Sequence, residues 1–274
     1  MTEEIQDGIY FRMPEEKYLA EDRLSKSGIK KMRISPADYW AESPFNPARK
    51  KRDTDALIVG SAYHCAILEP DRFAETYVRE LDKSEMPAGT LFTGGEMKEW
   101  LKENGLKQTG SVKEQADRIA EADPSQPVWQ TALTEWQASI KPGQIAISPD
   151  LYDTLIMDME RVHSIPAIHS LLSGGAAEVS VFWTDENGIK MKARFDYLKN
   201  DCWIELKTFA NPAGKNLNQC LLDAIRYNRY YIDAAAYMEA AEAIRSGSLD
   251  VMGEAADGER EIVAAIKQRA SELD

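Results

Sequence analysis

The hydrophobic positions along the chain change their period several times. Residues 55–69 form an apolar run of helical length. A second helix is predicted to begin with Ser148 as its N-cap and Pro149 as its first helical residue. Over residues 217–243 the apolar positions again follow a helical period. Long helices are therefore expected in both halves of the chain.

Between the last two helical segments, apolar and polar residues alternate. We predict three strands there, at about residues 177–184, 188–197 and 202–208. The Asn-Gly pair in "DENG" lies between the first two strands and is typical of a hairpin turn. The three strands are expected to pair in sequence order.

Residues 88–123 predict a small helix–loop–helix unit inserted in a larger fold. Two capping-box patterns, Thr93–Glu96 and Ser111–Glu114, each open a short amphipathic segment. "ENGLKQTG" between them indicates a helix stop followed by a loop, and "ADPSQP" after the second helix is typical of a linker.

Two carboxylates and a lysine are expected to meet at the last two predicted strands. Alternation places Glu205 and Lys207 on one face of the third strand. Asp196 lies at the end of the preceding strand, and a tight turn at "LKND" would bring it beside the next one. The three side chains can then converge.

Such a trio suits phosphodiester hydrolysis. Carboxylate oxygens bind hard cations such as Mg2+, which stabilise charge on the phosphate and lower the pKa of a bound water. A lysine ammonium orients or activates the attacking water, or neutralises the phosphate. Two alternatives stay open on this pattern alone. One is a glycosidase-type carboxylate pair, which has no need of the lysine; the other is a solvated, salt-bridged strand face.

Composition and charge narrow the protein class only slightly. The chain has 274 residues, of which 43% are hydrophobic and 29% charged, as in ordinary globular proteins. Its net charge of −13 argues against polyanion binding, yet "KSGIKKMR" and "ARKKR" are basic clusters. The three cysteines show no CxxC spacing, so a thiol-rich zinc site is not expected. We expect no membrane span and a cytoplasmic location, since "MTEEIQDG" lacks a signal-peptide core.

Four segments, taken in order, point to one family. They are "LSKSGIKKMRISPADYW", "VGSAYHCAILEPDRF", "AEVSVFWTDENGIKMKARFDYLKNDCWIELKT" and "YNRYYIDAAAYMEA". In this combination the chain resembles the RecE-type exonuclease (exonuclease VIII) family of the PD-(D/E)XK nuclease superfamily. The resemblance implies an α/β (α+β) fold with a mixed central sheet flanked by helices. It assigns residues 1–87 and 124–274 to the nuclease domain.

Position by position, the resemblance implies a Mg2+ site. Its histidine also suits Mn2+, which imidazole prefers to Mg2+. Without the resemblance, a histidine on an apolar helix is more often a core residue, and a lone strand glutamate is more often an edge charge. The assigned residues are the metal ligands Asp196, Glu205 and His64, the backbone carbonyl of Leu206, the catalytic Lys207 and the accessory Glu178.

The resemblance also implies an activity and partners. The family digests one strand of linear double-stranded DNA processively, typically 5′ to 3′. It leaves 3′ single strands for an annealing protein in phage-type recombination and works as a ring-shaped homo-oligomer. Two other functions stay open: a DNA-binding or scaffold protein on a decayed nuclease fold, and a restriction-type endonuclease.

The chain departs from the family pattern downstream of the trio. The family helix reads Q-x-x-x-Y, whereas the matching positions here are Asp233 and Tyr237. A carboxylate in place of the amide is expected to weaken phosphate binding by repulsion. The following apolar strand of the family also has no clear counterpart, because "SGSLDVMGEAADGEREIVAAIKQ" ends in an acidic helix.

Two basic regions are candidate DNA contacts. The insert at residues 88–123 resembles a SAP motif, a small DNA-binding helix–loop–helix, with a structural hairpin as the alternative. "ARKKR" is a candidate phosphate contact, with a solvated loop as the alternative. The lysines of the insert are Lys98, Lys102, Lys107 and Lys113, and the basic cluster contributes Arg49, Lys50, Lys51 and Arg52.

Overall fold

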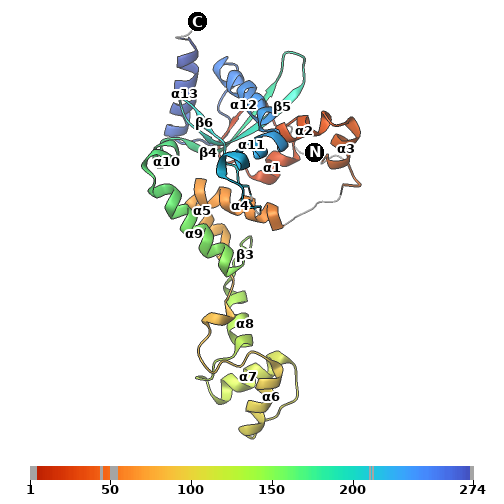
Figure 1. Cartoon of the computed structure of the whole chain (residues 1–274), viewed down its shortest axis with the longest axis vertical. Helices are drawn as coiled ribbons and strands as arrows, with labels where there is room; N and C mark the ends of the chain where they lie inside the picture. The colour runs from red at the N-terminus through yellow and green to blue at the C-terminus, as the bar shows by residue number, and fades with distance from the viewer. Residues whose placement is uncertain (1–4, 44–45, 50–54, 210, 212, 272–274) are drawn as a thin grey trace. The chain divides into compact units, whose positions relative to one another are not determined.

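A four-stranded antiparallel sheet lies at the centre of the first of two compact units (Figure 1). The computed structural model describes residues 5–43, 46–49, 55–209, 211 and 213–271. The first unit comprises residues 1–69 and 161–274. In sheet order, its strands are β1 (Gly8–Tyr10), β4 (Ala176–Thr184), β5 (Lys190–Leu198) and β6 (Trp203–Ile204).

Helices flank this sheet, so the expected α+β fold is confirmed. The central sheet differs from the mixed sheet expected, because its described strands all pair antiparallel, with parallel pairing limited to isolated bridges such as Leu24 with Met191. No described helix is both long and apolar enough to cross a membrane. The helices of the first unit are α1 (Glu15–Ala20), α2 (Lys26–Met32), α3 (Pro36–Glu42), α4 (Asp55–Leu68), α10 (Pro166–Leu171), α11 (Leu217–Tyr227), α12 (Tyr230–Arg245) and α13 (Asp257–Ser271).

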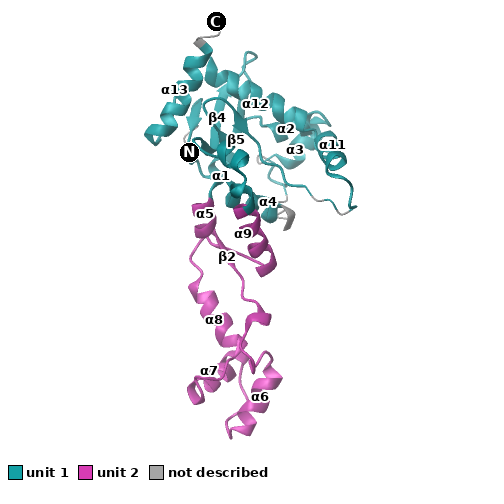
Figure 2. Ribbon diagram, turned by 60° about the vertical axis from the view of Figure 1, so that its left-hand side comes forward, with its two compact units in different colours: residues 1–69, 161–274 teal, residues 70–160 magenta. Residues whose placement is uncertain are grey.

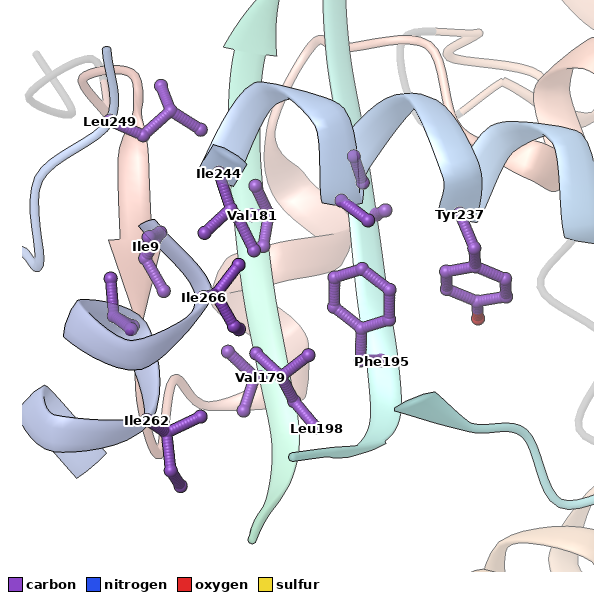
Figure 3. Close-up of a cluster of buried hydrophobic side chains, with 14 of the residues drawn as sticks. Ile9, Val179, Val181, Phe195, Leu198, Tyr237, Ile244, Leu249, Ile262 and Ile266 are labelled. Carbon is purple, nitrogen blue, oxygen red and sulfur yellow. The ribbon is translucent and has the colours of Figure 1, made fainter. Parts of the chain in front are cut away.

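The main hydrophobic core is formed between one face of the sheet and the helices α12 and α13 (Figure 3). Val179, Val181 and Phe195 are fully buried and share a face because they alternate along paired strands. Ile244 of α12 and Ile266 of α13 pack against them. Each such side chain stabilises the fold by about 1.5–3 kcal/mol through removal from water.

Helix α2 is held beside β5 by the segment that precedes it. Leu24 pairs with the strand in both directions, donating its amide to the carbonyl of Lys190 and accepting from the amide of Lys192, each at 2.9 Å. The buried ammonium of Lys192 also donates to the carbonyls of Tyr18 and Glu21, both at 2.8 Å. The first turn of α2 therefore lies close to the strand that carries Asp196.

Two predicted elements differ from those observed. The strand predicted at 202–208 ends at Ile204, because the amide of Leu206 donates to the side chain of Asp196 and not to a strand partner. The helix predicted over 217–243 is two helices, because Arg229 adopts a left-handed backbone with φ of 54°. The hairpin at "DENG" and the helix after Ser148 are confirmed.

The second compact unit comprises residues 70–160 and is coloured magenta in Figure 2. It contains a two-stranded parallel sheet of β2 and β3. Its elements are α5 (Pro70–Thr76), β2 (Tyr77–Arg79), a 3-10 turn (Lys83–Glu85), α6 (Gly94–Glu103), α7 (Val112–Ala122), α8 (Trp129–Ser139), β3 (Ile145–Ile147) and all but the last turn of α9 (Pro149–Ser164).

Within this unit, α6 and α7 form the helix–loop–helix predicted for residues 88–123. Both capping boxes are present, each with reciprocal side-chain and backbone hydrogen bonds. Met97 and Leu101 of α6 pack against Ile119 of α7 in a small core of their own. The pair is thus a locally stabilised element within residues 70–160.

We expect the core between α12 and the sheet to dominate stability. Ile244→Ala, at a fully buried position, should lower the free energy of unfolding by about 2–5 kcal/mol through lost burial and a cavity. The matched control is Met238→Ala on the same helix, where the side chain is 63% exposed. It should change stability by less than about 0.5 kcal/mol. Urea unfolding measures both, and equal effects would contradict this packing.

Candidate functional site

Glu178 and Asp196 face each other on the two central strands. The β4–β5 ladder pairs Val179 with Phe195, which places the neighbouring Glu178 across from Asp196. Glu178 has a left-handed backbone with φ of 54°, which is unfavourable by about 1–2 kcal/mol for a residue with a Cβ. Such strain persists only where the surroundings enforce it, and it clusters at functional sites.

His64 approaches the two carboxylates from α4. This helix is apolar, and its Ile67 and Leu68 pack against Tyr197 of β5, which directs His64 toward the strand end. One ligand atom from each of His64, Glu178 and Asp196 lies within 4.8 Å of the others. The distance from His64 Nδ1 to Asp196 Oδ2 is 3.7 Å, too long for a hydrogen bond.

The segment after β6 brings in the second predicted carboxylate. The amide of Leu206 donates to Asp196 Oδ2 at 2.7 Å, and the side chains of Ile204 and Leu206 pack in one apolar cluster. Glu205 and Lys207 point the other way and contact each other through Oε1 and Nζ. The alternation predicted from sequence therefore holds for these side chains although the strand itself is short.

Burial and charge set the pKa values in the site. Burial, together with the nearby Glu205, raises the pKa of Asp196 to about 7. Burial also raises the pKa of Glu178 to about 7, although Arg194 opposes it at a distance of 2.8 Å. Burial would raise the pKa of Glu205 as well, but Lys26 and Lys207 outweigh it and hold that pKa low. For Asp196 and Glu178, the nearby cations therefore do not offset the effect of burial on the pKa.

The basic side chains of His64 and Lys207 differ in charge state. Burial lowers the pKa of His64, which favours the neutral imidazole that ligates metals. Burial lowers the pKa of Lys207 too, but the contact with Glu205 raises it by more. Lys207 therefore stays in its charged ammonium form, stabilised by Glu205.

Two lysines of α2 complete the site, and the sequence reasoning missed their role. Lys26 Nζ lies 2.6 Å from Glu205 Oε1, and Lys30 Nζ lies 2.6 Å from Asp233 Oδ1. Their spacing of four residues puts both on one face of the helix. The signal was present in the basic cluster "KSGIKKMR", but sequence alone did not show which side chains that face would meet.

Asp233 and Tyr237 of α12 lie in the site, opposite α2. The charge of Asp233, expected to repel phosphate, is balanced by Lys30, and its second oxygen is 4.0 Å from Lys207 Nζ. The hydroxyl of Tyr237 donates to the carbonyl of Arg194 at 2.9 Å. Figure 3 shows its ring beside Phe195 with the hydroxyl pointing away from α12.

The predicted DNA contacts fall in separate places. Exposed Arg49 lines a cleft of about 510 Å³ whose walls also include Lys26, Glu178 and Asp196. The remaining members of the basic cluster, Lys50, Lys51 and Arg52, lie outside the described residues. In the second unit, the four predicted lysines are exposed: Lys98, Lys102, Lys107 and Lys113.

The donor set fits a divalent cation. Carboxylate oxygens and a neutral imidazole are ligands for Mg2+ and Mn2+. Glu205 Oε2 is buried and accepts no hydrogen bond within the described part of the chain, which leaves it free for a cation. His64, Glu178 and Asp196 form the one group of possible ligands found among the described residues. Glu205, whose charge acts on Asp196, stays a predicted ligand. The predicted role of the Leu206 carbonyl stays a prediction.

Comparison with known proteins gives the family. Residues 25–272 match the family described as a PDDEXK-like domain of unknown function (DUF3799). The chain belongs to this family. The match includes every site residue from Lys26 to Tyr237, so it supports a nuclease-type function that uses divalent metal. Among curated proteins the search found no match.

The raised pKa of Asp196 predicts how the metal-free PDDEXK-like domain responds to pH. Because the folded-state pKa of about 7 exceeds the unfolded value of about 3.9, the folded protein holds this proton more tightly. The resulting stability is complete below about pH 4 and is lost as pH rises through about 7. Glu178 contributes with the same sign.

Thermal melts in chelator between pH 5 and 8 should therefore show stability falling with pH. Asp196→Asn should flatten this dependence, because the amide does not titrate. Asp38→Asn, at an exposed carboxylate of α3, is the control and should leave it unchanged. Glu178 should leave a smaller slope in Asp196→Asn, and a slope as steep as that of the wild type would contradict the pKa assignment.

Proposed function

We propose that this chain is a metal-dependent exodeoxyribonuclease of RecE type. It would digest one strand of linear double-stranded DNA, 5′ to 3′, and leave 3′ single-stranded tails for phage-type recombination. The observation that carries the proposal is the convergence of Asp196, Glu205 and Lys207 beside a cleft. Leu206 links the three, since its amide binds Asp196 at 2.7 Å while its two neighbours contact each other.

The residues divide the chemistry between them. Asp196, Glu205 and His64 would hold Mg2+, with Mn2+ as a substitute. When bound, the ion supplies charge neutralisation at the phosphate and acidifies a water. Lys207, kept charged by Glu205, would orient the attacking water or donate to a phosphate oxygen. Asp233 and Tyr230 hold its ammonium, at 4.0 Å from the carboxylate and 5.4 Å from the ring centre.

The cleft supports a nucleic-acid substrate. Its volume of about 510 Å³ lies within the range of ligand pockets, about 300–1,000 Å³. Side chains of both charges line the cleft. The cationic side chains are Arg23, Lys26, Lys31, Arg49, Lys192 and Arg194, and the carboxylates are Glu21, Glu42, Glu178 and Asp196. A phosphodiester backbone in the cleft would thus meet more cationic than anionic side chains.

A catalytically weakened DNA-binding protein on the same fold is the alternative. This alternative rests on the presence of Asp233 where the family pattern has glutamine. The pairing of Asp233 with Lys30 favours the enzyme, because the site then carries no uncompensated charge from that position. An annealing partner and a ring-shaped homo-oligomer remain part of the proposal by resemblance alone.

Cleavage should depend on linear ends and on Lys207. End-labelled linear duplex with Mg2+ should be degraded progressively, whereas closed circular duplex should survive. Lys207→Ala should slow cleavage by at least about a hundredfold through lost electrostatic stabilisation and spare most DNA binding. Lys215→Ala is the matched control, since Lys215 pairs with Asp223 outside the site, and its rate should change little.

Linear DNA left intact with both Mg2+ and Mn2+ would refute the enzymatic proposal. Retained turnover in Lys207→Ala would exclude that lysine from catalysis. Cleavage of the circular substrate would replace the exonuclease with an endonuclease.

We also propose that the SAP-like helix–loop–helix of the second unit contacts phosphates. Lys102→Gln should reduce the slope of log K against log salt for DNA binding by about one, as expected for one lost phosphate contact. Lys141→Gln, at another exposed lysine of the same unit, should leave the slope unchanged. Filter binding across a salt series distinguishes the two, and identical slopes would favour a purely structural hairpin.

A further inference from the structure

Lys26 reaches the site from the first turn of α2, where the helix is firmly placed. The side chain of Ser25 caps α2 by accepting from the amide of Gly28 at 3.3 Å. Gly28 is buried, and a Cβ there would lie 2.9 Å from a methyl of Leu24 and 3.1 Å from the ring of Tyr39. The absence of that Cβ lets α2 pack closely, which directs Lys26 toward the strand segment.

Two ammoniums share one oxygen of Glu205. Both Lys26 and Lys207 contact Oε1, and all three side chains are largely shielded from water, at 28%, 28% and 16% exposure. Like charges at such short range repel strongly where water is excluded. The single negative charge of Glu205 balances only one of the two ammoniums that contact this oxygen.

The two lysines have different second partners. Lys207 lies 4.0 Å from the carboxylate of Asp233, so it keeps an anionic neighbour if Glu205 turns to another cation. Among the described residues, the second contact of Lys26 is the neutral Tyr237, whose hydroxyl it contacts and whose ring centre lies 4.5 Å away. Asp196 acts on Lys26 through its charge without an ion-pair contact. Loss of Glu205 would therefore cost Lys26 more than Lys207.

We infer that Lys26 is a positioning residue that competes with the divalent cation for Glu205. Without the ion, its ammonium occupies Glu205 Oε1 and keeps the buried carboxylate folded into the site. An ion bound at the free Glu205 Oε2 would repel the ammonium on Oε1 of the same carboxylate. Lys26, which lines the cleft, would then give up this contact and keep the one with Tyr237. Lys26 would thereby weaken metal binding, and metal binding would be coupled to a movement of the Lys26 side chain.

This inference rests on the metal centre of the proposed function. By linkage, a group that must be displaced lowers the apparent affinity of the ligand that displaces it. Removal of the ammonium also removes a positive charge next to the ion. Both effects have the same sign, so loss of the charge at position 26 should tighten metal binding and destabilise the metal-free protein.

The test is calorimetric titration of the full chain with Mn2+ alone, without DNA. Lys26→Met should bind Mn2+ about tenfold more tightly than the wild type. Lys26→Arg keeps the charge and should bind Mn2+ with nearly wild-type affinity. Lys31→Met is the matched control on the same helix, because Lys31 contacts Glu42 and none of the proposed metal ligands. Its affinity for Mn2+ should not change.

Thermal melts give a second readout. Mn2+ should raise the melting temperature of Lys26→Met by more than that of the wild type, because stabilisation by a ligand grows with its affinity. Lys26→Gln repeats both measurements with a polar side chain, so that a folding defect of the methionine variant leaves the comparison intact.

The outcomes separate the inference from the function. A wild type that binds no Mn2+ would refute the metal centre and the inference together. A wild type that binds Mn2+, with unchanged or weaker binding in both neutral variants, would refute the competition and leave the proposed nuclease standing. Tighter binding in Lys26→Met and Lys26→Gln, but not in Lys31→Met, supports Lys26 as the competing cation.

Discussion

Burial of carboxylates at the end of the β4–β5 pair is the constraint on which the rest of the site depends. Asp196 and Glu178 are removed from water at positions that the strand pairing fixes, and Glu178 holds a strained backbone there. Charge buried in this way requires cations. Lys26 and Lys207 pair with Glu205, and Arg194 pairs with Glu178. Within the described residues, Asp196 has the Leu206 amide as its one partner at hydrogen-bond distance. The divalent ion that we propose at Asp196 would complete this balance.

The same constraint explains the packing around the site. Helix α2 lies where its lysines reach carboxylates of two other elements, Glu205 beyond β6 and Asp233 on α12. Helix α12 buries apolar residues such as Ile244 against the sheet and presents the hydroxyl of Tyr237 to the site. One helix thus connects the hydrophobic core to the polar site, so loss of core packing is expected to disturb the chemistry as well.

Sequence predicted the pieces whose signals are local. Period-two alternation located the hairpin and placed Glu205 and Lys207 together, and capping boxes located α6 and α7. Sequence did not predict where β6 ends. The Leu206 amide, which alternation assigns to strand pairing, donates instead to the Asp196 side chain. Nor did sequence predict that Lys26 and Lys30 enter the site, since contacts more than 170 residues apart in sequence depend on tertiary packing. The substitution at Asp233 was visible, but its partner Lys30 was not.

We propose that Asp196 anchors a divalent cation between its neighbouring carboxylates. Anomalous diffraction from crystals soaked in Mn2+ tests it most directly. We expect a peak within about 2.5 Å of an Asp196 oxygen, with Glu205 or the His64–Glu178 pair completing the coordination. A protein that takes up Mn2+ at another position, or shows no peak beside Asp196, would contradict it.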